Sequence, residues 1–268
     1  MRLAAFCLVA LAASLFPAAG SADTRPGPQL ETTVPAEHAD WTRLLKTHVK
    51  MGSDGITRFD YAGLAASQTG RAALDAYIAR FADIDLSAKT DANFAAWANL
   101  YNAVTVRHIV ERYPVKSIRD GSLAGPWKVV KVKADGREVS LDDIEHKILR
   151  KTWGTPDVHY ALNCASYSCP NLPPKAWEAA TLEADLAAAA RAYVNQARGV
   201  SVTARGLAVS SIYDWFEADF GGSKAAVIEH LLKYAEPGLA EKIRANPKIV
   251  RYRYDWSLND AAKLKKKR

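Results

Sequence analysis

Two cysteines are the side chains of this chain most able to carry out covalent chemistry. Cys164 and Cys169 enclose the four residues Ala-Ser-Tyr-Ser, and Pro170 follows them. A partly exposed thiol becomes a nucleophile when a cationic histidine or backbone dipoles lower its pKa. Outside the cytoplasm, two nearby thiols tend to oxidise to each other instead. Two hypotheses therefore stay open: a nucleophilic Cys164, and a Cys164–Cys169 disulfide that closes the loop.

Two histidines and a carboxylate are candidate acid–base partners for a thiol. Glu145 and His146 adjoin each other in a predicted short helix at 141–150, and His159 precedes the first cysteine by five positions. Neighbouring side chains on an α-helix point about 100° apart, so Glu145 and His146 do not easily face one ligand. One of them is expected to serve the site while the other anchors the helix. The alternatives are a core histidine bonded to a carbonyl and a glutamate paired with Arg150.

Asn99 and Asn102 stand inside the strongest helical pattern of the chain, at 91–112. Apolar residues recur there at spacings of three and four, Thr90 is a suitable N-cap, and Pro114 ends the pattern. Short amides compete with the helical backbone, and buried ones need hydrogen-bond partners. Either these amides support catalysis, by orienting a histidine or donating to an oxyanion, or they tie the helix to a neighbouring loop.

The same side chains offer nitrogen, oxygen and sulfur ligands, but their spacing argues against a metal centre. Structural zinc sites usually pair their ligands at short, regular spacings. Here a C-x₄-C pair is accompanied only by scattered histidines. We therefore expect neither a metal nor another cofactor.

The pattern around these residues predicts one α+β domain. The expected helices lie at 36–50, 69–82, 91–112, 141–150, 178–197, 211–219, 222–235 and 238–245. The expected strands are the hairpins 128–141 and 200–209 and the single strands 158–163 and 249–256. Because helices outnumber strands and the strands come mostly in hairpins, we expect helices packed on a small, largely antiparallel sheet, with the 91–112 helix against it.

The first 22 residues are typical of a cleavable secretory signal. A single positive charge, Arg2, precedes an apolar run and then small residues that end at Ala22. The run is shorter than the ~20 residues needed to span a bilayer, and no second one follows. We expect a secreted or periplasmic protein without a transmembrane segment. Its parts would be an irregular leader at 23–35, a globular domain at 36–260 and a basic tail at 261–268.

Charge does not predict a nucleic-acid partner. The chain has 36 Lys and Arg against 29 Asp and Glu, a formal net charge of +7. Five of the positive charges lie in the last six residues, 263–268, so the body of the domain is close to neutral. Such short basic runs are usually solvated termini. The expected partner is therefore a peptide or a small molecule.

Four segments together resemble one known family. They are WANLYNA at 97–103, DIEH at 143–146 with ILR at 148–150, HYALNC at 159–164 running on to SCP at 168–170, and YDWSLN at 254–259. In order and spacing they are similar to the domain of unknown function 547, found in exported bacterial proteins and at the carboxy terminus of plant proteins. The resemblance covers nearly all of the chain after the signal. It also implies a distant likeness to papain- and transglutaminase-like proteins, and hence a divergent papain-like scaffold.

The resemblance implies a function but departs from the papain pattern. Papain-like enzymes place the nucleophilic cysteine at the start of a long helix, whereas the long helix here carries asparagines. In the plant members the positions of Cys164, Glu145 and His146 keep their residue types. We therefore expect a thiol-dependent hydrolase or acyl transferase acting on an amide or thioester. Cys164 would attack, His146 or His159 would take its proton, and Glu145 would orient the imidazole. The alternative is a non-catalytic peptide- or ligand-binding module with a disulfide.

Overall fold

The computed structural model describes residues 38–121 and 125–266 of the 268-residue chain. The expected signal at 1–22 and leader at 23–35 lie outside the described residues. All described residues belong to one compact unit. None of the described helices is both long and apolar enough to cross a membrane.

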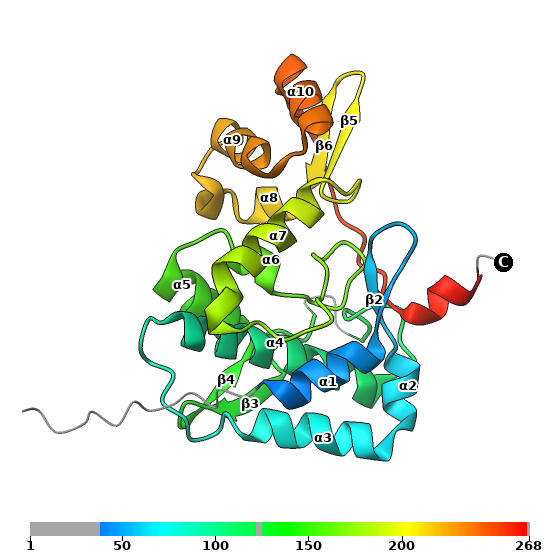
Figure 1. The fold of residues 1–268 in the computed structure, drawn as a ribbon, viewed down its shortest axis with the longest axis vertical. Coiled ribbons are helices and arrows are strands. Elements are labelled where there is room, and N and C mark those ends of the chain that lie inside the picture. Colours follow the sequence, from blue (N-terminus) through cyan, green and yellow to red (C-terminus); the bar gives the residue numbers. More distant parts are fainter. Residues whose placement is uncertain (1–37, 122–124, 267–268) are drawn as a thin grey trace, which may run out of the picture. The chain divides into compact units, whose positions relative to one another are not determined.

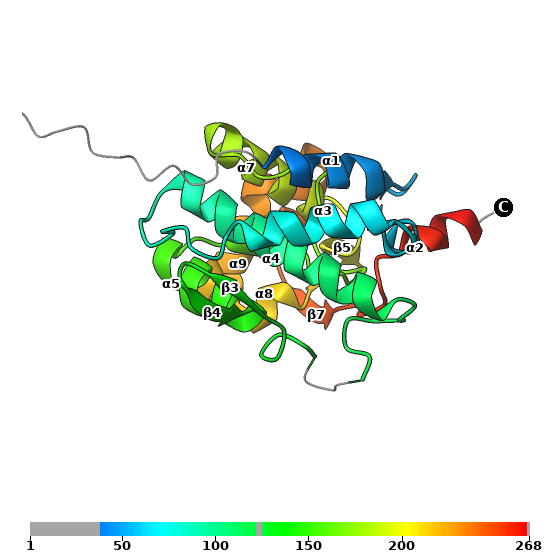
Figure 2. The same cartoon turned by 90° about the horizontal axis from the view of Figure 1, so that it is seen from below.

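The helix that carries the two asparagines, α4 (Asp91–Arg112), is the centre of the first half of the domain. The Thr90 side chain caps it by accepting a hydrogen bond from the Asn93 N–H at 3.2 Å, and the helix stops before Pro114, as expected. Its residues are buried on every side between positions 93 and 106. Helices α2 (Tyr61–Ala66) and α3 (Gln68–Ala79) pack against it, and α1 (Ala39–His48) packs against α3. Figure 2 shows α1, α3 and α4 in this order.

The segment that carries Glu145 and His146 follows a tight hairpin. Strands β3 (Lys131–Ala134) and β4 (Arg137–Ser140) pair antiparallel around Asp135-Gly136, both at positive φ, as a two-residue turn of this type requires. The chain then forms a π-helix, η1 (Asp143–Leu149), which continues into α5 (Arg150–Trp153). The expected helix at 141–150 is therefore present, but with a wider turn than an α-helix.

The prediction of a strand at 158–163 is wrong. Residues Val158–Ala161 form a short helix, α6, and Leu162, directly after it, is extended. The start of this helix is fixed locally, because the Asp157 N–H donates to the Thr155 hydroxyl at 3.3 Å and the Asp157 carbonyl accepts from Tyr160 and Ala161. This Thr-Pro-Asp sequence is a helix-start signal, and it outweighs the strand-like apolar pattern that follows.

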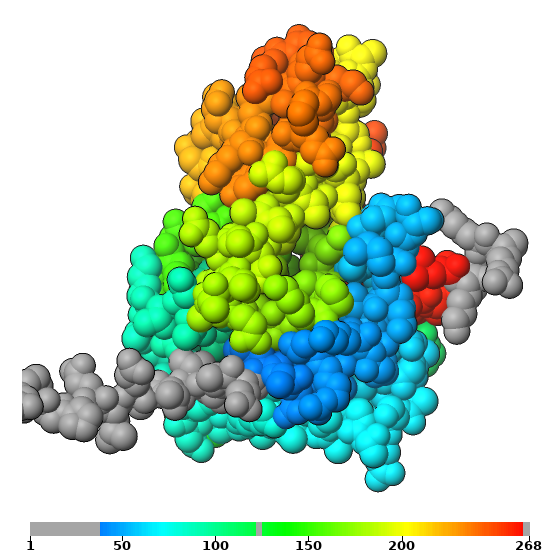
Figure 3. Space-filling view, in the orientation of Figure 1, coloured from blue at the N-terminus to red at the C-terminus, as the bar shows by residue number. Residues whose placement is uncertain are grey.

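The second half of the domain builds its own core around a three-stranded sheet. Strands β5 (Val200–Thr203) and β6 (Gly206–Ser210) form the expected hairpin, and β7 (Ile249–Arg253) pairs parallel with β6. The helices of this half are α7 (Leu182–Val194), α8 (Ile212–Trp215), α9 (Lys224–Tyr234) and α10 (Pro237–Ala245). Figure 1 shows α8, α9 and α10 beside β5 and β6. On the face shown in Figure 3, the α7 region lies between α9 and α1.

The α+β class is confirmed, with one correction to the sheet. Among the described residues the strands form three small sheets rather than one, because β1 (Val49–Met51) and β2 (Thr57–Phe59) pair separately, as do β3 and β4. The third sheet is mixed, since a parallel β7 joins the β5–β6 hairpin. The start of the expected basic tail is a 3₁₀ helix at Ala261–Lys266.

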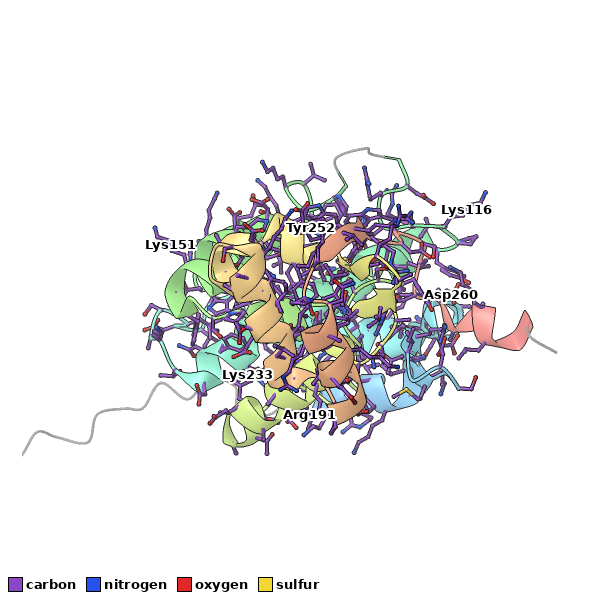
Figure 4. The ribbon with its side chains drawn as sticks, turned by 90° about the horizontal axis from the view of Figure 1, so that it is seen from above. Lys116, Lys151, Arg191, Lys233, Tyr252 and Asp260 are labelled. Carbon is purple, nitrogen blue, oxygen red and sulfur yellow. The ribbon has the colours of Figure 1, made fainter. Side chains whose placement is uncertain are left out.

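Exposed cations are spread over separate elements. Figure 4 shows Lys151, Arg191 and Lys233 around the edge of the domain, on α5, α7 and α9 respectively, and Lys116 on the loop after α4. All four are exposed.

Candidate functional site

A cavity of about 600 Å³ opens beside the two thiols. Both cysteines line it, and so do three of the other side chains expected from the sequence, namely Glu145, His146 and His159. Aromatic rings make up much of the remaining wall: Tyr101, Trp127, Trp215, Phe216, Tyr254 and Trp256. The tertiary structure therefore gathers the candidate nucleophile, carboxylate and imidazoles around one apolar space.

The two cysteines are free thiols in contact with each other. Their Sγ atoms lie 2.6 Å apart, which is longer than the ~2.05 Å of a disulfide. The Sγ of Cys169 accepts a hydrogen bond from the Cys164 N–H at 3.0 Å and from the Ser166 hydroxyl at 3.3 Å. The Tyr254 hydroxyl lies 3.2 Å from the same sulfur and 3.3 Å from that of Cys164. The expected disulfide is absent from the structure, and several donors converge on one sulfur instead.

This convergence separates the pKa values of the two thiols. Burial works to raise the pKa of Cys169, but hydrogen bonds from the Cys164 thiol, Ser166 and Tyr254 outweigh it and lower that pKa to about 6. The hydrogen bond to Cys169, together with burial, raises the pKa of Cys164 well above its usual value. The two sulfurs are too close to titrate independently, and their surroundings favour the negative charge on Cys169 over Cys164.

The π-helix presents Glu145 and His146 to the same cavity. We expected their side chains to diverge too far for this, but a π-helix has more residues per turn, so consecutive side chains diverge less. The Glu145 Oε2 atom accepts a hydrogen bond from the Tyr101 hydroxyl at 3.1 Å. Burial raises the pKa of Glu145, against the opposing effects of His146 and of this hydrogen bond. The buried carboxyl group therefore binds its proton more tightly than an exposed glutamate does.

His146 is oriented by a neighbouring arginine. Its Nδ1 atom lies 3.0 Å from Nη1 of Arg150, one helical turn further along. A guanidinium only donates, so Nδ1 accepts, and the neutral imidazole carries its proton on Nε2. The Nε2 atom is 3.8 Å from Oδ1 of Asp142. His146 therefore offers the cavity a hydrogen-bond donor rather than a base.

His159 belongs to an ion-pair network at the side of the cavity. Its Nε2 atom lies 2.7 Å from Oδ2 of Asp219, and its ring stacks on Phe216 at 4.2 Å between centroids. The same carboxylate accepts two hydrogen bonds from Arg150, at 2.6 and 3.0 Å. Burial opposes ionisation of Asp219, but the hydrogen bonds from His159 and Arg150 prevail and hold its pKa well below the usual value. Burial lowers the pKa of His159, against the effect of Asp219.

The two asparagines of α4 bind backbone rather than the cavity. The Asn99 amide donates to the Trp177 carbonyl at 2.9 Å and accepts from the Trp177 N–H at 3.0 Å. The Asn102 amide donates to the Ala161 carbonyl at 2.9 Å and accepts from the Asn163 N–H at 2.8 Å. Neither is among the residues that line the cavity. Both amides are thus fully used in holding chain segments onto α4, which is the second of the two roles considered for them.

Asn102 fixes the entrance of the cysteine loop, and other side chains hold the rest of it. The Asn163 Oδ1 atom accepts from the Ala165 N–H at 2.9 Å and from the Asn259 amide at 3.2 Å. Ala165 has a φ of 61°, a left-handed conformation that non-glycine residues rarely adopt. Its carbonyl accepts from the Asn259 N–H at 2.9 Å. The turn between the cysteines is therefore held from both sides, and the terminal segment of the chain is part of the site.

Three side chains that shape the site were missed by the sequence reasoning. Tyr254 was considered only as part of the segment YDWSLN that resembles the family. A tyrosine two positions before a tryptophan, as here before Trp256, could have indicated an aromatic ligand-binding wall. Ser166 lies between the two cysteines in the sequence, and its hydroxyl could have been recognised as a possible hydrogen-bond donor to their sulfurs. Asp219 gave no signal, because nothing near it in the sequence indicates that it meets His159. Among the described residues, no group of three or more His, Cys, Asp or Glu side chains could hold a metal ion.

The fold and the site define an α+β domain with a hydrogen-bonded thiol pair at an aromatic cavity. Residues 86–194 match the model of the family described as "Protein of unknown function, DUF547", which is the family that the sequence resembles. The match contains α4, η1 and both cysteines, whereas Asp219 and Tyr254 lie beyond it. No curated protein and no solved structure matches the chain. The likeness to papain stays a prediction.

Proposed function

We propose that this domain is a thiol-dependent acyl-transfer enzyme, a hydrolase or transferase that forms an acyl thioester on Cys164. The observation that carries the proposal is the 2.6 Å contact between the two sulfurs in a cavity that also contains Glu145. Burial and hydrogen bonding lower the pKa of Cys169 and raise that of Glu145. Titratable groups whose pKa values are driven apart in this way mark the acid and the base of a site.

In the first step the Cys164 sulfur attacks the acyl carbon of an amide or thioester. Cys164 is half-buried and Cys169 is only 3% exposed, so access favours Cys164 as the nucleophile. As the Sγ–C bond forms, the Cys164 proton passes to the Cys169 thiolate, and the carbonyl π electrons move to oxygen. The Nε2–H of His146 is a candidate donor to that oxygen.

In the second step the tetrahedral intermediate loses its amine or thiol. Protonated Glu145 gives its proton to the leaving nitrogen or sulfur as the C–N or C–S bond breaks, which leaves acyl-Cys164 and a Glu145 carboxylate. Water, or an acceptor amine or alcohol, then attacks the thioester and gives its proton to Glu145. Cys164 departs with the proton returned by Cys169, and the starting protonation states are restored.

These roles differ from the ones expected from the sequence. There, His146 or His159 was to take the thiol proton and Glu145 was to orient the imidazole. In the structure His146 Nδ1 accepts from Arg150 and His159 Nε2 pairs with Asp219. The Cys169 sulfur, in contrast, is in direct contact with the thiol. The contacts therefore support Cys169 as the proton acceptor.

Acyl-enzyme trapping tests the proposal. Reduced protein is mixed with S-phenyl thioacetate, an activated thioester, and analysed by intact mass and peptide mapping. We expect one acetyl group on Cys164, persisting longer in Glu145→Gln, which lacks the base for deacylation. Cys164→Ser should show none. Cys169→Ser should acylate more slowly by about 10²-fold, the usual contribution of a general base. Absence of the adduct, or equal rates in Cys169→Ser and wild type, would overturn the proposal.

The competing function is a non-catalytic peptide- or ligand-binding module clamped by a disulfide. It predicts that Cys164 and Cys169 resist alkylation in non-reduced protein and react only after a reductant is added. The proposed enzyme predicts that both thiols are free under non-reducing conditions. Alkylation with iodoacetamide, followed by peptide mapping of the two cysteines, decides between these outcomes.

A further inference from the structure

Three polar side chains on the cavity wall already have hydrogen-bond partners within the protein. The Tyr101 hydroxyl donates to Glu145 at 3.1 Å, and the Tyr254 hydroxyl lies 2.7 Å from the Ser166 hydroxyl. The His159 Nε2 atom is paired with Asp219 at 2.7 Å. A ligand that relied on hydrogen bonds to these three groups would have to displace their partners. The aromatic faces are the surfaces that a ligand can cover without such a loss.

Three of the rings that line the cavity are packed around a fourth, Trp256. Its centroid lies 4.5 Å from that of Tyr254, 5.5 Å from Trp215 and 5.7 Å from Trp127. The plane of Trp215 is only 24° from that of Trp256, whereas Trp127 meets it at 68°. These contacts make the rings one continuous apolar wall beside the sulfurs, which we call the aromatic wall.

Exposure varies along the lining. Tyr101 and Cys169, beside the thiol pair, are 1% and 3% exposed. Trp215 is 47% exposed and Val129 is 75% exposed, although both also line the cavity. The exposed residues therefore mark the mouth and the buried ones the inner end. A tryptophan left this accessible at the mouth of an apolar cavity offers a large area for a ligand to bury.

We propose that the acyl group accepted by this cavity is large and apolar, an alkyl chain or an aryl group that lies on the aromatic wall while its carbonyl reaches Cys164. This deepens the proposed function and rests on it for the chemistry, although the binding part can be tested separately. The leaving group is not specified by the wall, since the wall contacts only the side of the substrate that stays on the enzyme.

An ester series tests the acyl preference. The substrates are p-nitrophenyl acetate, butyrate and octanoate, and p-nitrophenyl phenylacetate as a substrate with an aryl group. Their hydrolysis is measured by the release of p-nitrophenol. We expect kcat/KM to rise about threefold for each of the first methylene groups added to the acyl chain, because burying one methylene group has an effect of this size. A larger gain for octanoate than for phenylacetate assigns an alkyl chain, and the reverse assigns an aryl group. Equal kcat/KM across the series would overturn the inference.

Variants connect this preference to the aromatic wall. Trp215→Ala should reduce kcat/KM for octanoate relative to that for acetate by about tenfold, through loss of apolar contact. Trp215→Phe should retain most of the preference and shows that the fold tolerates a change at this position. Val250→Ala, which truncates a 40% exposed apolar side chain on β7, is the matched control and should leave both substrates unchanged. An unaltered octanoate preference in Trp215→Ala would contradict the proposal.

A binding measurement separates this inference from the proposed function. Cys164→Ser protein is titrated with sodium octanoate and sodium acetate while tryptophan fluorescence is recorded. Saturable quenching by octanoate alone supports the apolar site, and identical responses to the two salts would overturn it. If no ester acylates the wild type but octanoate still quenches, the proposed function fails and the apolar site stands. If esters acylate without regard to chain length, the function stands and this inference fails.

Discussion

The hydroxyl of Tyr254 lies 3.2 Å from the sulfur of Cys169, although the two residues are 85 positions apart in the chain. Burial raises the pKa of Tyr254 well above its usual value, so the phenol keeps its proton and is the donor of this hydrogen bond. The contact brings the end of the chain into the cysteine loop. It is also one of the reasons why the Cys169 thiolate is stable.

Removing this donor should therefore raise the thiol pKa. We expect Tyr254→Phe to shift the pKa of the Cys169 thiol upward by about one unit, because a hydrogen bond to a charged group contributes ~1.5–3 kcal/mol. The shift is measured as ultraviolet thiolate absorbance against pH. Tyr252→Phe is the matched control, since the buried Tyr252 hydroxyl has no hydrogen-bond partner among the described residues. Identical titration midpoints in the two variants would show that Tyr254 does not stabilise the thiolate.

Asp219 should stabilise the fold in a pH-dependent way. Its pKa is lower in the folded protein than in the unfolded chain, so its contribution is complete above about pH 5 and is lost as the pH falls through the acid range. We expect Asp219→Asn to lower the free energy of unfolding at pH 7 by about 2 kcal/mol, because Arg150 and His159 lose a charged partner.

The difference between wild type and Asp219→Asn should shrink as the pH is lowered toward 3. Urea unfolding at several pH values measures it, with Asp214→Asn, at an exposed acid on α8, as the control that should change little. A constant difference from pH 7 to pH 3 would contradict the assigned ion pair.

Asn102 should be required for stability rather than for chemistry. We expect Asn102→Leu to lower the free energy of unfolding by about 1–3 kcal/mol, because the Ala161 carbonyl and the Asn163 N–H would be left buried without a partner. Thr105→Val, on the same helix, is the control. Within the part of the chain that the structure describes, the buried Thr105 hydroxyl has no hydrogen-bond partner, so its replacement should be neutral or slightly stabilising. Equal melting temperatures for the two variants would refute this role of Asn102.

Glu145 should lower the free energy of unfolding of the protein at neutral pH. Burial raises its pKa in the folded state, so the fold binds this proton more tightly than the unfolded chain does. Stability is therefore lost as the pH rises from the unfolded pKa, about 4.3, toward the folded value. We expect Glu145→Gln to unfold at higher urea than wild type at pH 7 and to lose this advantage below pH 4. Glu229→Gln, at an exposed position on α9, should show no such pH-dependent gain.

The sequence alone determined the features that depend on neighbours along the chain. Thr90 and Pro114 delimit α4, and the Asp135-Gly136 turn defines the β3–β4 hairpin, because caps and turns involve residues only a few positions apart. The residue types also identified Glu145, His146, His159 and the cysteines as candidates, and all of them line the cavity. The fold class followed from the same local patterns, and four sequence segments indicated the family whose model matches residues 86–194.

The tertiary structure alone decided which of these residues meet and how each is charged. The Cys169 thiolate depends on Tyr254, and Asp219 reaches His159 across 60 positions. The parallel pairing of β7 with β6 is likewise a contact between distant segments. A pKa is set by whichever groups folding places within a few ångströms of an atom, and no periodicity along the chain encodes that placement. The sequence therefore indicates which side chains are able to react, while tertiary packing determines the pKa of each of them.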